Sequence, residues 1–291
     1  MDKSKFPAPG DLVDVGSHRL HIYGIGEGSP TVVLDSEYNG SWLDWSWVQP
    51  EVAKFTRVVS YDRAGLGWSD PAKPRSIQRI VNELHRLLAN AGVGGPYVMV
   101  GQSSGGMNVR VYASQHPQDV VGMVLVNAAH EDWPEIKLQA PSRGRLLEDL
   151  REQMLQLYPI LARLGVLRLR RKPNGPVLAL PPNIQPIAMA LGLRSRAYDW
   201  VWGAKTEIQL SESQIRDSSP LPEIPLAVLS AHIRGEPWGI PAHEADSYWM
   251  ALQEDLANLV PNSTHTVSEH GGHNLHVDDP DLVIDAIRQV V

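Results

Sequence analysis

The sequence predicts an α/β protein with a mostly parallel, doubly wound sheet, and three observations support this. Short, continuous apolar runs recur at residues 31–35, 57–62, 97–101, 122–127, 225–230 and 264–268. Such β-branched runs are typical of strands that are covered on both faces. Helical patterns separate them, at residues 76–92, 106–117, 247–260 and 280–291. The alternation of strands and helices of this length indicates βαβ units.

Two regions depart from this alternation. Residues 12–26 alternate apolar and polar side chains around a Gly-Ser pair, which is typical of an antiparallel hairpin. From residue 133 to residue 220 there is no strand signal, and helical fragments and prolines take its place. We therefore expect residues 1–132 and 221–291 to form the core, and residues 133–220 to form an inserted helical cap. The cap would lie over the carboxyl ends of the strands, where open α/β sheets bind ligands.

Composition excludes several classes of function. The 291 residues carry a net charge of −7, which argues against general nucleic-acid binding because that needs a basic face. The chain has no cysteine, so disulfides, thiolate metal sites and a cysteine nucleophile are excluded. The N-terminus lacks an apolar segment of signal-peptide length, and no run approaches the roughly 20 residues of a membrane span. We expect a cytoplasmic protein.

The stretch Gly101-Gln102-Ser103-Ser104-Gly105 has the pattern G-x-S-x-G. It follows an apolar run and precedes a helical pattern, which is the strand–turn–helix context of a nucleophile elbow. Gly101, Gly105 and Gly106 would keep this sharp turn free of colliding side chains. Ser103 is therefore the candidate nucleophile; the alternative is an ordinary glycine-rich entry into a helix.

A serine nucleophile needs an imidazole within hydrogen-bond reach. His273 lies after the last strand signal and before the last helix, where the base belongs in the chain order serine, acid, histidine. Gly271 and Gly272 would allow a tight loop there. His270 and His276 are rival candidates, and a surface histidine-rich loop is the alternative interpretation.

Four segments together resemble the landmarks of the α/β-hydrolase fold, in that family's order: residues 61–70, 100–106, 120–132 and 271–280. The resemblance implies that Ser103 is the nucleophile and His273 the general base. It also implies an oxyanion hole formed by the backbone N–H groups of Ser104 and Glu37. The family's elbow usually has histidine where this chain has Gln102.

The acid of the triad is the uncertain member. The resemblance implies a carboxylate about 24 positions after the nucleophile, but Asn127 stands there. An asparagine can orient an imidazole but cannot stabilise an imidazolium as a carboxylate does. Asp132, near the usual strand end, is the favoured acid. Its rivals are Glu236, Glu131 and Glu37, and Asn127 itself leaves open an incomplete triad.

The sequence as a whole predicts a serine hydrolase that cleaves carboxylic esters of small to medium apolar substrates, without a metal or organic cofactor. Tyr38, Trp42 and Gln102 are expected to bind the substrate, although core packing is the alternative for the tryptophan. Hydrolysis of lactones or C–C bonds, lyase activity and non-enzymatic ligand binding remain open. The basic stretch 163–172 could touch a lipid surface, but a solvated cap face is favoured.

Overall fold

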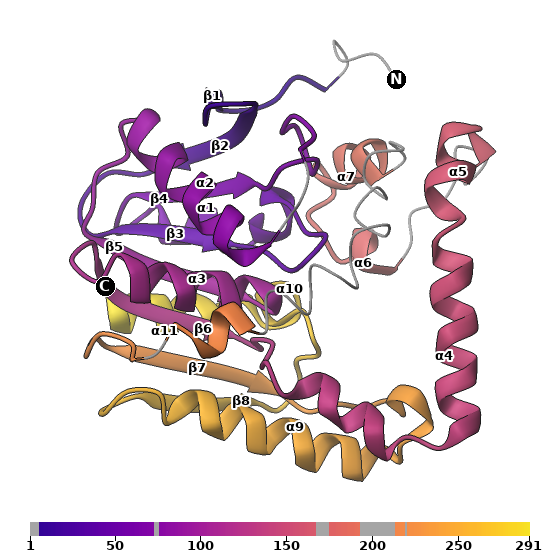
Figure 1. Cartoon of the computed structure of the whole chain (residues 1–291). Coiled ribbons are helices and arrows are strands. Elements are labelled where there is room, and N and C mark those ends of the chain that lie inside the picture. The colour runs from indigo at the N-terminus through magenta and orange to yellow at the C-terminus, as the bar shows by residue number, and fades with distance from the viewer. Residues whose placement is uncertain (1–5, 73–75, 167–174, 193–212, 219) are drawn as a thin grey trace.

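A computed structural model describes every residue except 1–5, 73–75, 167–174, 193–212 and 219 (Figure 1). Its centre is an eight-stranded sheet with the order β1-β2-β4-β3-β5-β6-β7-β8. β1 pairs with β2, and β2 with β4, in antiparallel fashion, and the other pairs are parallel. The strands are β1 (Asp11–Asp14), β2 (Arg19–Ile25), β3 (Thr31–Asp35), β4 (Val58–Asp62), β5 (Tyr97–Gln102), β6 (Val120–Val126), β7 (Leu226–Ala231) and β8 (Thr264–Ser268). The predicted hairpin and parallel strands are confirmed.

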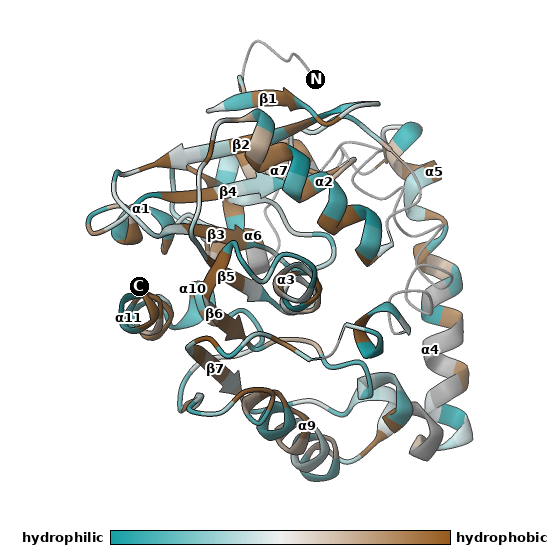
Figure 2. Ribbon diagram, turned by 60° about the vertical axis from the view of Figure 1, so that its left-hand side comes forward, coloured by the Kyte–Doolittle hydropathy of each residue, from teal (hydrophilic) through white to brown (hydrophobic). Residues whose placement is uncertain are grey.

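Helices cover both faces of the sheet (Figures 1 and 2). One face is covered by α2 (Ile77–Asn90), α3 (Ser104–Gln115) and α9 (Ala242–Ala257), and the other by α1 (Gln49–Val52) and α11 (Pro280–Val290). The shorter elements of the core are η1 (Trp42–Trp45), η5 (Pro237–Gly239) and α10 (Leu275–Asp278). The doubly wound arrangement is therefore also confirmed.

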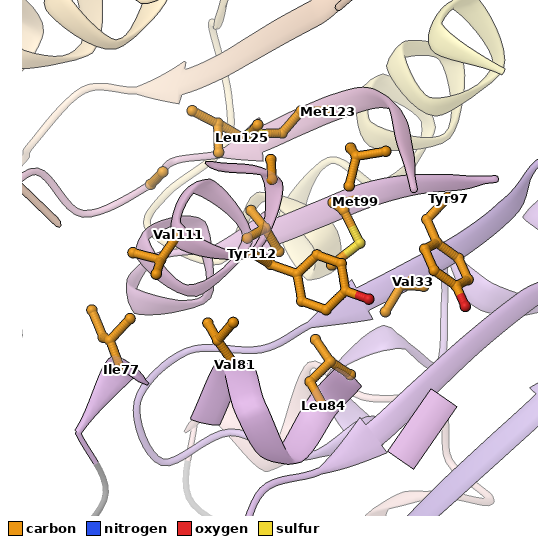
Figure 3. Packing of buried hydrophobic residues seen from close by; sticks show 14 of the residues in the cluster. Val33, Ile77, Val81, Leu84, Tyr97, Met99, Val111, Tyr112, Met123 and Leu125 are labelled. Atoms are coloured by element: carbon orange, nitrogen blue, oxygen red, sulfur yellow. The ribbon is translucent and has the colours of Figure 1, made fainter. Parts of the chain in front are cut away.

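The central strands β3 to β7 are buried almost throughout because they lie between the two helical layers. In β5, Met99 belongs to the cluster beneath α2 and α3, whereas Val98 and Val100 belong to the cluster beneath α1 and α11. Successive side chains of a strand point to opposite faces, so a continuous apolar run packs into the hydrophobic clusters on both faces of the sheet. Figure 3 shows the first core, with Tyr112 of α3 near Met99 and the α2 side chain of Leu84.

Between β6 and β7, the residues that the structure describes form helices and no strand. These elements are η2 (Trp133–Gln139), α4 (Ser142–Leu155), α5 (Tyr158–Arg163), α6 (Gly175–Leu178) and α7 (Gln185–Gly192). They lie beside the sheet on the side where β3 and β5 end (Figure 1). The expected cap region is thus helical where it is described, and its limits at residues 133 and 220 stay a prediction. None of the described helices combines the length and the apolar character needed to cross a membrane.

The turn between β5 and α3 is tightly packed. A Cβ atom added at Gly105 would lie 2.3 Å from the carbonyl oxygen of Asp35, and one at Gly101 would lie 2.5 Å from backbone atoms of Gly105. Real Cβ atoms do not approach backbone atoms so closely. The glycines of the elbow therefore allow α3 to begin directly against the end of β3.

We predict that Gly105→Ala lowers the free energy of unfolding by about 1–3 kcal/mol or more, because the methyl group would force α3 away from β3. Gly94→Ala is a matched control, since a Cβ at Gly94 meets nothing within 4 Å. Urea unfolding of the two variants measures the difference. Equal stability of both variants would contradict the close packing described for the elbow.

Candidate active site

Ser103 occupies the turn between β5 and α3 in a strained backbone conformation. Its φ and ψ angles are 52° and −122°, a region that residues other than glycine rarely adopt. The turn is fixed by hydrogen bonds: Ser103 N–H donates to Val126 O, and Ser103 O accepts from the N–H groups of Gly106 and Ala129. Ser104 follows as the first residue of α3, so its N–H is one of those without a partner inside the helix. This is the geometry of a nucleophile elbow.

Ser103 and His273 line one cavity of about 470 Å³ at the carboxyl ends of the strands. His273 lies in the loop between β8 and α10, and its side chain is about half exposed. Its backbone oxygen accepts hydrogen bonds from Gln102 Nε2 at 3.2 Å and from Asn127 Nδ2 at 3.4 Å. The ends of β5 and β6 thereby hold the loop that carries the imidazole.

Asn127, which follows β6, is the residue that contacts His273 Nδ1. It is buried, and its Nδ2 lies 3.2 Å from that ring nitrogen. Its φ of 43° is in the left-handed region that asparagine tolerates better than most residues. The structure therefore brings asparagine to Nδ1 of His273, where the sequence resemblance implied a carboxylate.

The amide of Asn127 has only one orientation that satisfies its neighbours. Its Oδ1 accepts from the N–H of Ala231 at 3.1 Å and from the indole N–H of Trp249 at 3.3 Å. Turning the amide over would place its NH₂ group against two donors, so Nδ2 must face His273. Because Nδ2 is a donor, Nδ1 of the imidazole must accept, and neutral His273 then carries its proton on Nε2.

Glu37 lies on the other side of the imidazole. Its Oε2 is 3.8 Å from Nε2 of His273, and its side chain is about one-third exposed. Its backbone oxygen accepts from Gly40 N–H and from the Arg63 guanidinium. Glu37 is thus held just after β3, and its carboxylate lies beside Nε2 of His273, the ring nitrogen that carries the proton.

A buried ion pair holds the loop that contains Glu37. Arg63 donates to Asp35 Oδ1 at 2.8 Å and to the backbone oxygen of Ser36 at 2.9 Å. The other carboxylate oxygen of Asp35 accepts from Tyr61 and from Asn108 of α3. Burial raises the pKa of Asp35, although its three donors, Arg63, Asn108 and Tyr61, favour its ionised form. The network links β3, β4 and α3 directly beneath the expected oxyanion hole.

Asp44 adds a second acidic group near Glu37. Burial, with smaller contributions from the charges of Glu37 and Asp62, raises the pKa of Asp44 to about 7. Its Oδ2 accepts from the N–H of Ser41 at 2.8 Å. At neutral pH part of the population carries a proton on Asp44, which lessens the repulsion between it and Glu37. No sequence pattern pointed to this residue.

The other expected acids lie elsewhere. Asp132, the favoured acid, pairs with Arg216, and its N–H donates to Nδ1 of His130 at 3.0 Å.

Glu131 forms a two-pronged hydrogen bond with Arg110. Burial alone would raise the pKa of Glu131, but Arg110 lowers it to about 2. Asp132 and Glu131 thus have other partners, and Glu236 precedes η5 as an exposed residue. None of the three has a hydrogen bond or ion pair with His273 among the described contacts. The expectation that Asp132 orients the base is corrected to Asn127.

The residues expected to bind substrate also differ from those that line the cavity. Trp42 is buried against Tyr23 and Trp68, so the core-packing alternative holds for it. Gln102 is fully buried and supports the His273 loop. Tyr38 lies in the loop after β3, outside the described lining.

Beside Ser103 and His273, the cavity is lined by apolar residues and by a smaller polar group: Ala129, Trp133, Ala231, Ile233 and Trp249, with Asn127, His232, Arg234 and Gly272. The rings of Trp133 and Trp249 meet edge to face at 5.1 Å. Trp133 begins the helical region and Trp249 lies in α9. No pattern in the sequence predicted that Trp133 and Trp249 would contact each other in the cavity that Ser103 lines.

The rival histidines differ from His273 in their surroundings. His276 is buried in α10 against Trp45, and burial, helped by His273, lowers the pKa of His276 to about 3, so it stays neutral. His270 is exposed. Neither lines the cavity in the part of the chain that the structure describes.

One group of side chains has the composition of a metal site, away from the cavity. His85, His116 and Asp119 gather at the far end of α3, with potential ligand atoms within 4.8 Å of one another. The two imidazole rings are stacked, with centroids 4.1 Å apart and planes at 1°. A bound ion prefers to lie in the plane of each ligating ring, and one ion cannot lie in two parallel planes. The geometry therefore favours ring stacking over metal binding.

The sheet order, the elbow and the helical region after β6 define an α/β-hydrolase-fold protein with serine at the nucleophile position. A family model described as the alpha/beta hydrolase fold matches residues 27–159, which contain the elbow. This match covers less than half of the chain and, together with the sheet order, supports the α/β-hydrolase-fold superfamily that the sequence resemblance implied.

Individual relatives match different parts of the chain. A probable transporter of Hormonema carpetanum is 31% identical over 149 residues, which are 48% of this chain and 21% of that protein. The chain thus spans about a fifth of that relative. The uncharacterized protein YqjL of Bacillus subtilis is 24% identical over 272 residues, covering 91% of this chain and 85% of the relative. The structure of a thermophilic esterase from Thermogutta terrifontis superposes with a TM-score of 0.65 at 20% identity, covering 96% of each chain.

Proposed function

We propose that this protein is a serine hydrolase that cleaves carboxylic esters of small to medium apolar substrates through an acyl-enzyme. The observation that carries the proposal is the strained conformation of Ser103 at the edge of a cavity that His273 also lines. Strain of this kind persists only where the surrounding structure enforces it, and it is found at functional sites. The tryptophan-lined wall supports an apolar acyl or alcohol group.

In the proposed reaction, Ser103 Oγ attacks the ester carbonyl carbon and its proton passes to Nε2 of His273. The N–H groups of Ser104 and Glu37 stabilise the negative oxygen of the tetrahedral intermediate. The C–O bond to the alcohol then breaks, and His273 returns the proton to the leaving oxygen. A water molecule, deprotonated by His273, hydrolyses the acyl-enzyme and frees Ser103. No metal or organic cofactor takes part.

Asn127 makes this reaction slow in the proposed scheme. His273 can accept the serine proton only when Nε2 is bare, and its own proton must then lie on Nδ1. That proton would face the NH₂ group of Asn127, which is a donor–donor conflict. In a serine protease, replacing the triad aspartate with asparagine lowered turnover about 10⁴-fold through the wrong tautomer. The same physical reason applies here.

The orientation of Asn127 also favours a second candidate, in which the site does not hydrolyse esters. Nε2–H of His273 would then donate a proton to a ligand, and Glu37 beside it would accept one. Proton transfer of this kind suits lyase or C–C bond chemistry, and without a reacting ligand it suits simple binding. The two tests below separate this candidate from ester hydrolysis.

The first test is labelling of the nucleophile. We predict that a fluorophosphonate probe labels the wild-type protein, and that the Ser103→Ala variant shows no labelling because the attacking oxygen is gone. Ser104→Ala is the control, since it keeps the backbone N–H and should still be labelled. Mass spectrometry of the labelled peptide identifies the modified residue. Absence of labelling in the wild type, with both variants folded, would favour the second candidate.

The second test is restoration of the acid. Asn127→Asp would keep one oxygen facing Ala231 and Trp249 and place the other opposite His273 Nδ1. We predict that kcat/KM for short-chain p-nitrophenyl esters rises by about two orders of magnitude or more, because the carboxylate fixes the Nδ1–H tautomer and stabilises the imidazolium.

Three control variants make this result specific. Asp132→Asn weakens the ion pair with Arg216, which keeps Glu135 as a second partner, and should leave turnover near the wild-type value. Asn127→Ala should give no gain. The double variant Ser103→Ala/Asn127→Asp should be inactive. A strong loss in Asp132→Asn, with no gain in Asn127→Asp, would refute the role given to Asn127.

A further inference from the structure

The lining of the cavity at Ser103 carries a permanent positive charge and no negative one. Arg234, which follows β7, lines the cavity, whereas no aspartate or glutamate does so among the described residues. The whole chain has 33 acidic side chains against 26 arginines and lysines, so its composition does not predict a cavity of this charge. A guanidinium group stays protonated in proteins, and a positive charge at a cavity attracts anionic ligands.

One nitrogen of Arg234 is anchored to the loop that carries His273. Its Nη2 donates to the backbone oxygens of Glu269 at 3.2 Å and His270 at 3.4 Å, just after the end of β8. Its Nε and Nη1 have three further N–H groups, and these have no acceptor among the described residues. The side chain is thus held in place and retains donors for a ligand.

Arg234 also lacks a carboxylate partner in the part of the chain that the structure describes. Several other arginines each pair with a carboxylate: Arg19, Arg63, Arg79, Arg110, Arg216 and Arg288. An unpaired guanidinium beside a cavity can instead pair with a carboxylate on the ligand.

Two carboxylates contact histidines of the lining without lining the cavity themselves. Oδ2 of Asp246 lies 2.8 Å from Nδ1 of His232, and its Oδ1 accepts from the N–H of Ile233 at 2.7 Å. Glu37 lies beside Nε2 of His273 at 3.8 Å. Neither acid forms an ion pair with Arg234 among the described contacts, so no carboxylate contact compensates the charge of Arg234.

The apolar part of the lining restricts the ligand further. Trp133, Ile233 and Trp249 supply apolar surface in the same cavity, which has a volume of about 470 Å³. A ligand whose apolar body covers these side chains excludes water from the cavity, and a charge-assisted hydrogen bond is stronger where water is excluded. One guanidinium compensates one negative charge, so a carboxylate fits this site better than a dianionic phosphate monoester.

We propose that the cavity takes a ligand with an apolar body and a free carboxylate, which Arg234 binds through a charge-assisted hydrogen bond. The inference deepens the proposed function, and it rests on that function only in treating the ligand as the substrate. The substrate would then be an ester that carries a second, free carboxylate, and Arg234 would select it over neutral esters.

The experiment is calorimetric titration of the Ser103→Ala variant, which lacks the nucleophile and leaves the ligand intact. The ligands are monomethyl glutarate, monomethyl adipate and monomethyl suberate, each compared with its neutral dimethyl ester. We expect at least one half-ester to bind about tenfold more tightly than its dimethyl ester, because only the half-ester can accept a hydrogen bond with a negative charge. Raising the salt concentration should narrow this difference.

Variants made in the Ser103→Ala background assign the preference to Arg234. Arg234→Gln should bind the half-ester as weakly as the dimethyl ester, whereas Arg234→Lys keeps the charge and should retain part of the preference. Arg288→Gln is the matched control, because it makes the same change in net charge in α11, outside the cavity, and should keep the full preference.

Three outcomes would overturn the proposal. The first is that the half-esters and the dimethyl esters bind equally or not at all. The second is a preference that survives in Arg234→Gln, since the carboxylate would then be held elsewhere. The third is an equal weakening of both kinds of ligand by Arg234→Gln, since Arg234 would then only hold the loop of His273.

Turnover by the wild-type protein separates this inference from the proposed function. If the half-esters bind preferentially through Arg234 but no ester is hydrolysed, the carboxylate site stands and ester hydrolysis fails. If neutral esters are hydrolysed and the half-esters show no preference in binding, ester hydrolysis stands and the carboxylate site fails.

Discussion

Two N–H donors, the backbone amide of Ala231 and the indole of Trp249, point at a single side-chain oxygen of Asn127. Both donors are buried and have this oxygen as their acceptor, so leaving them without one would cost roughly 1–3 kcal/mol each. That constraint fixes the amide, the amide fixes the tautomer of His273, and the tautomer decides which ring nitrogen can take a proton. The proton positions of His273, on which the proposed reaction depends, are therefore set by two hydrogen bonds outside the imidazole itself.

The remainder of the site is built as an efficient nucleophilic centre would be. The elbow holds Ser103 at a positive φ, and the close approach of α3 to β3 is possible only because Gly105 has no side chain. The buried pair of Asp35 and Arg63 ties the loop of Glu37 to the sheet. These features stabilise a backbone that is costly to form. The proposed function accounts for both features together, the strain at Ser103 and the neutral amide beside His273, by a slow or altered reaction.

The sequence predicted the architecture well because the relevant signals are local. Each buried strand is an unbroken apolar run, and the elbow's glycines are adjacent in the chain. Asn127 was singled out because the family resemblance implied a carboxylate at its position. Asp132 was favoured because it lies near a strand end, yet its partner Arg216 is 84 residues away, and no local pattern pairs them. The orientation of Asn127 depends on Ala231 and Trp249, which are 104 and 122 residues distant. The meeting of Trp133 and Trp249 in the cavity wall is a tertiary contact of the same kind.

The most direct test of this account is the tautomer of His273, measured by ¹⁵N–¹H NMR correlation of the imidazole nitrogens in uniformly labelled protein, with His273→Gln used to assign the signals. The account predicts that in the neutral ring the proton resides on Nε2 in the wild type and on Nδ1 in Asn127→Asp. A wild-type imidazole with its proton on Nδ1 would contradict it, because the amide of Asn127 would then be turned over and His273 would already be a competent base.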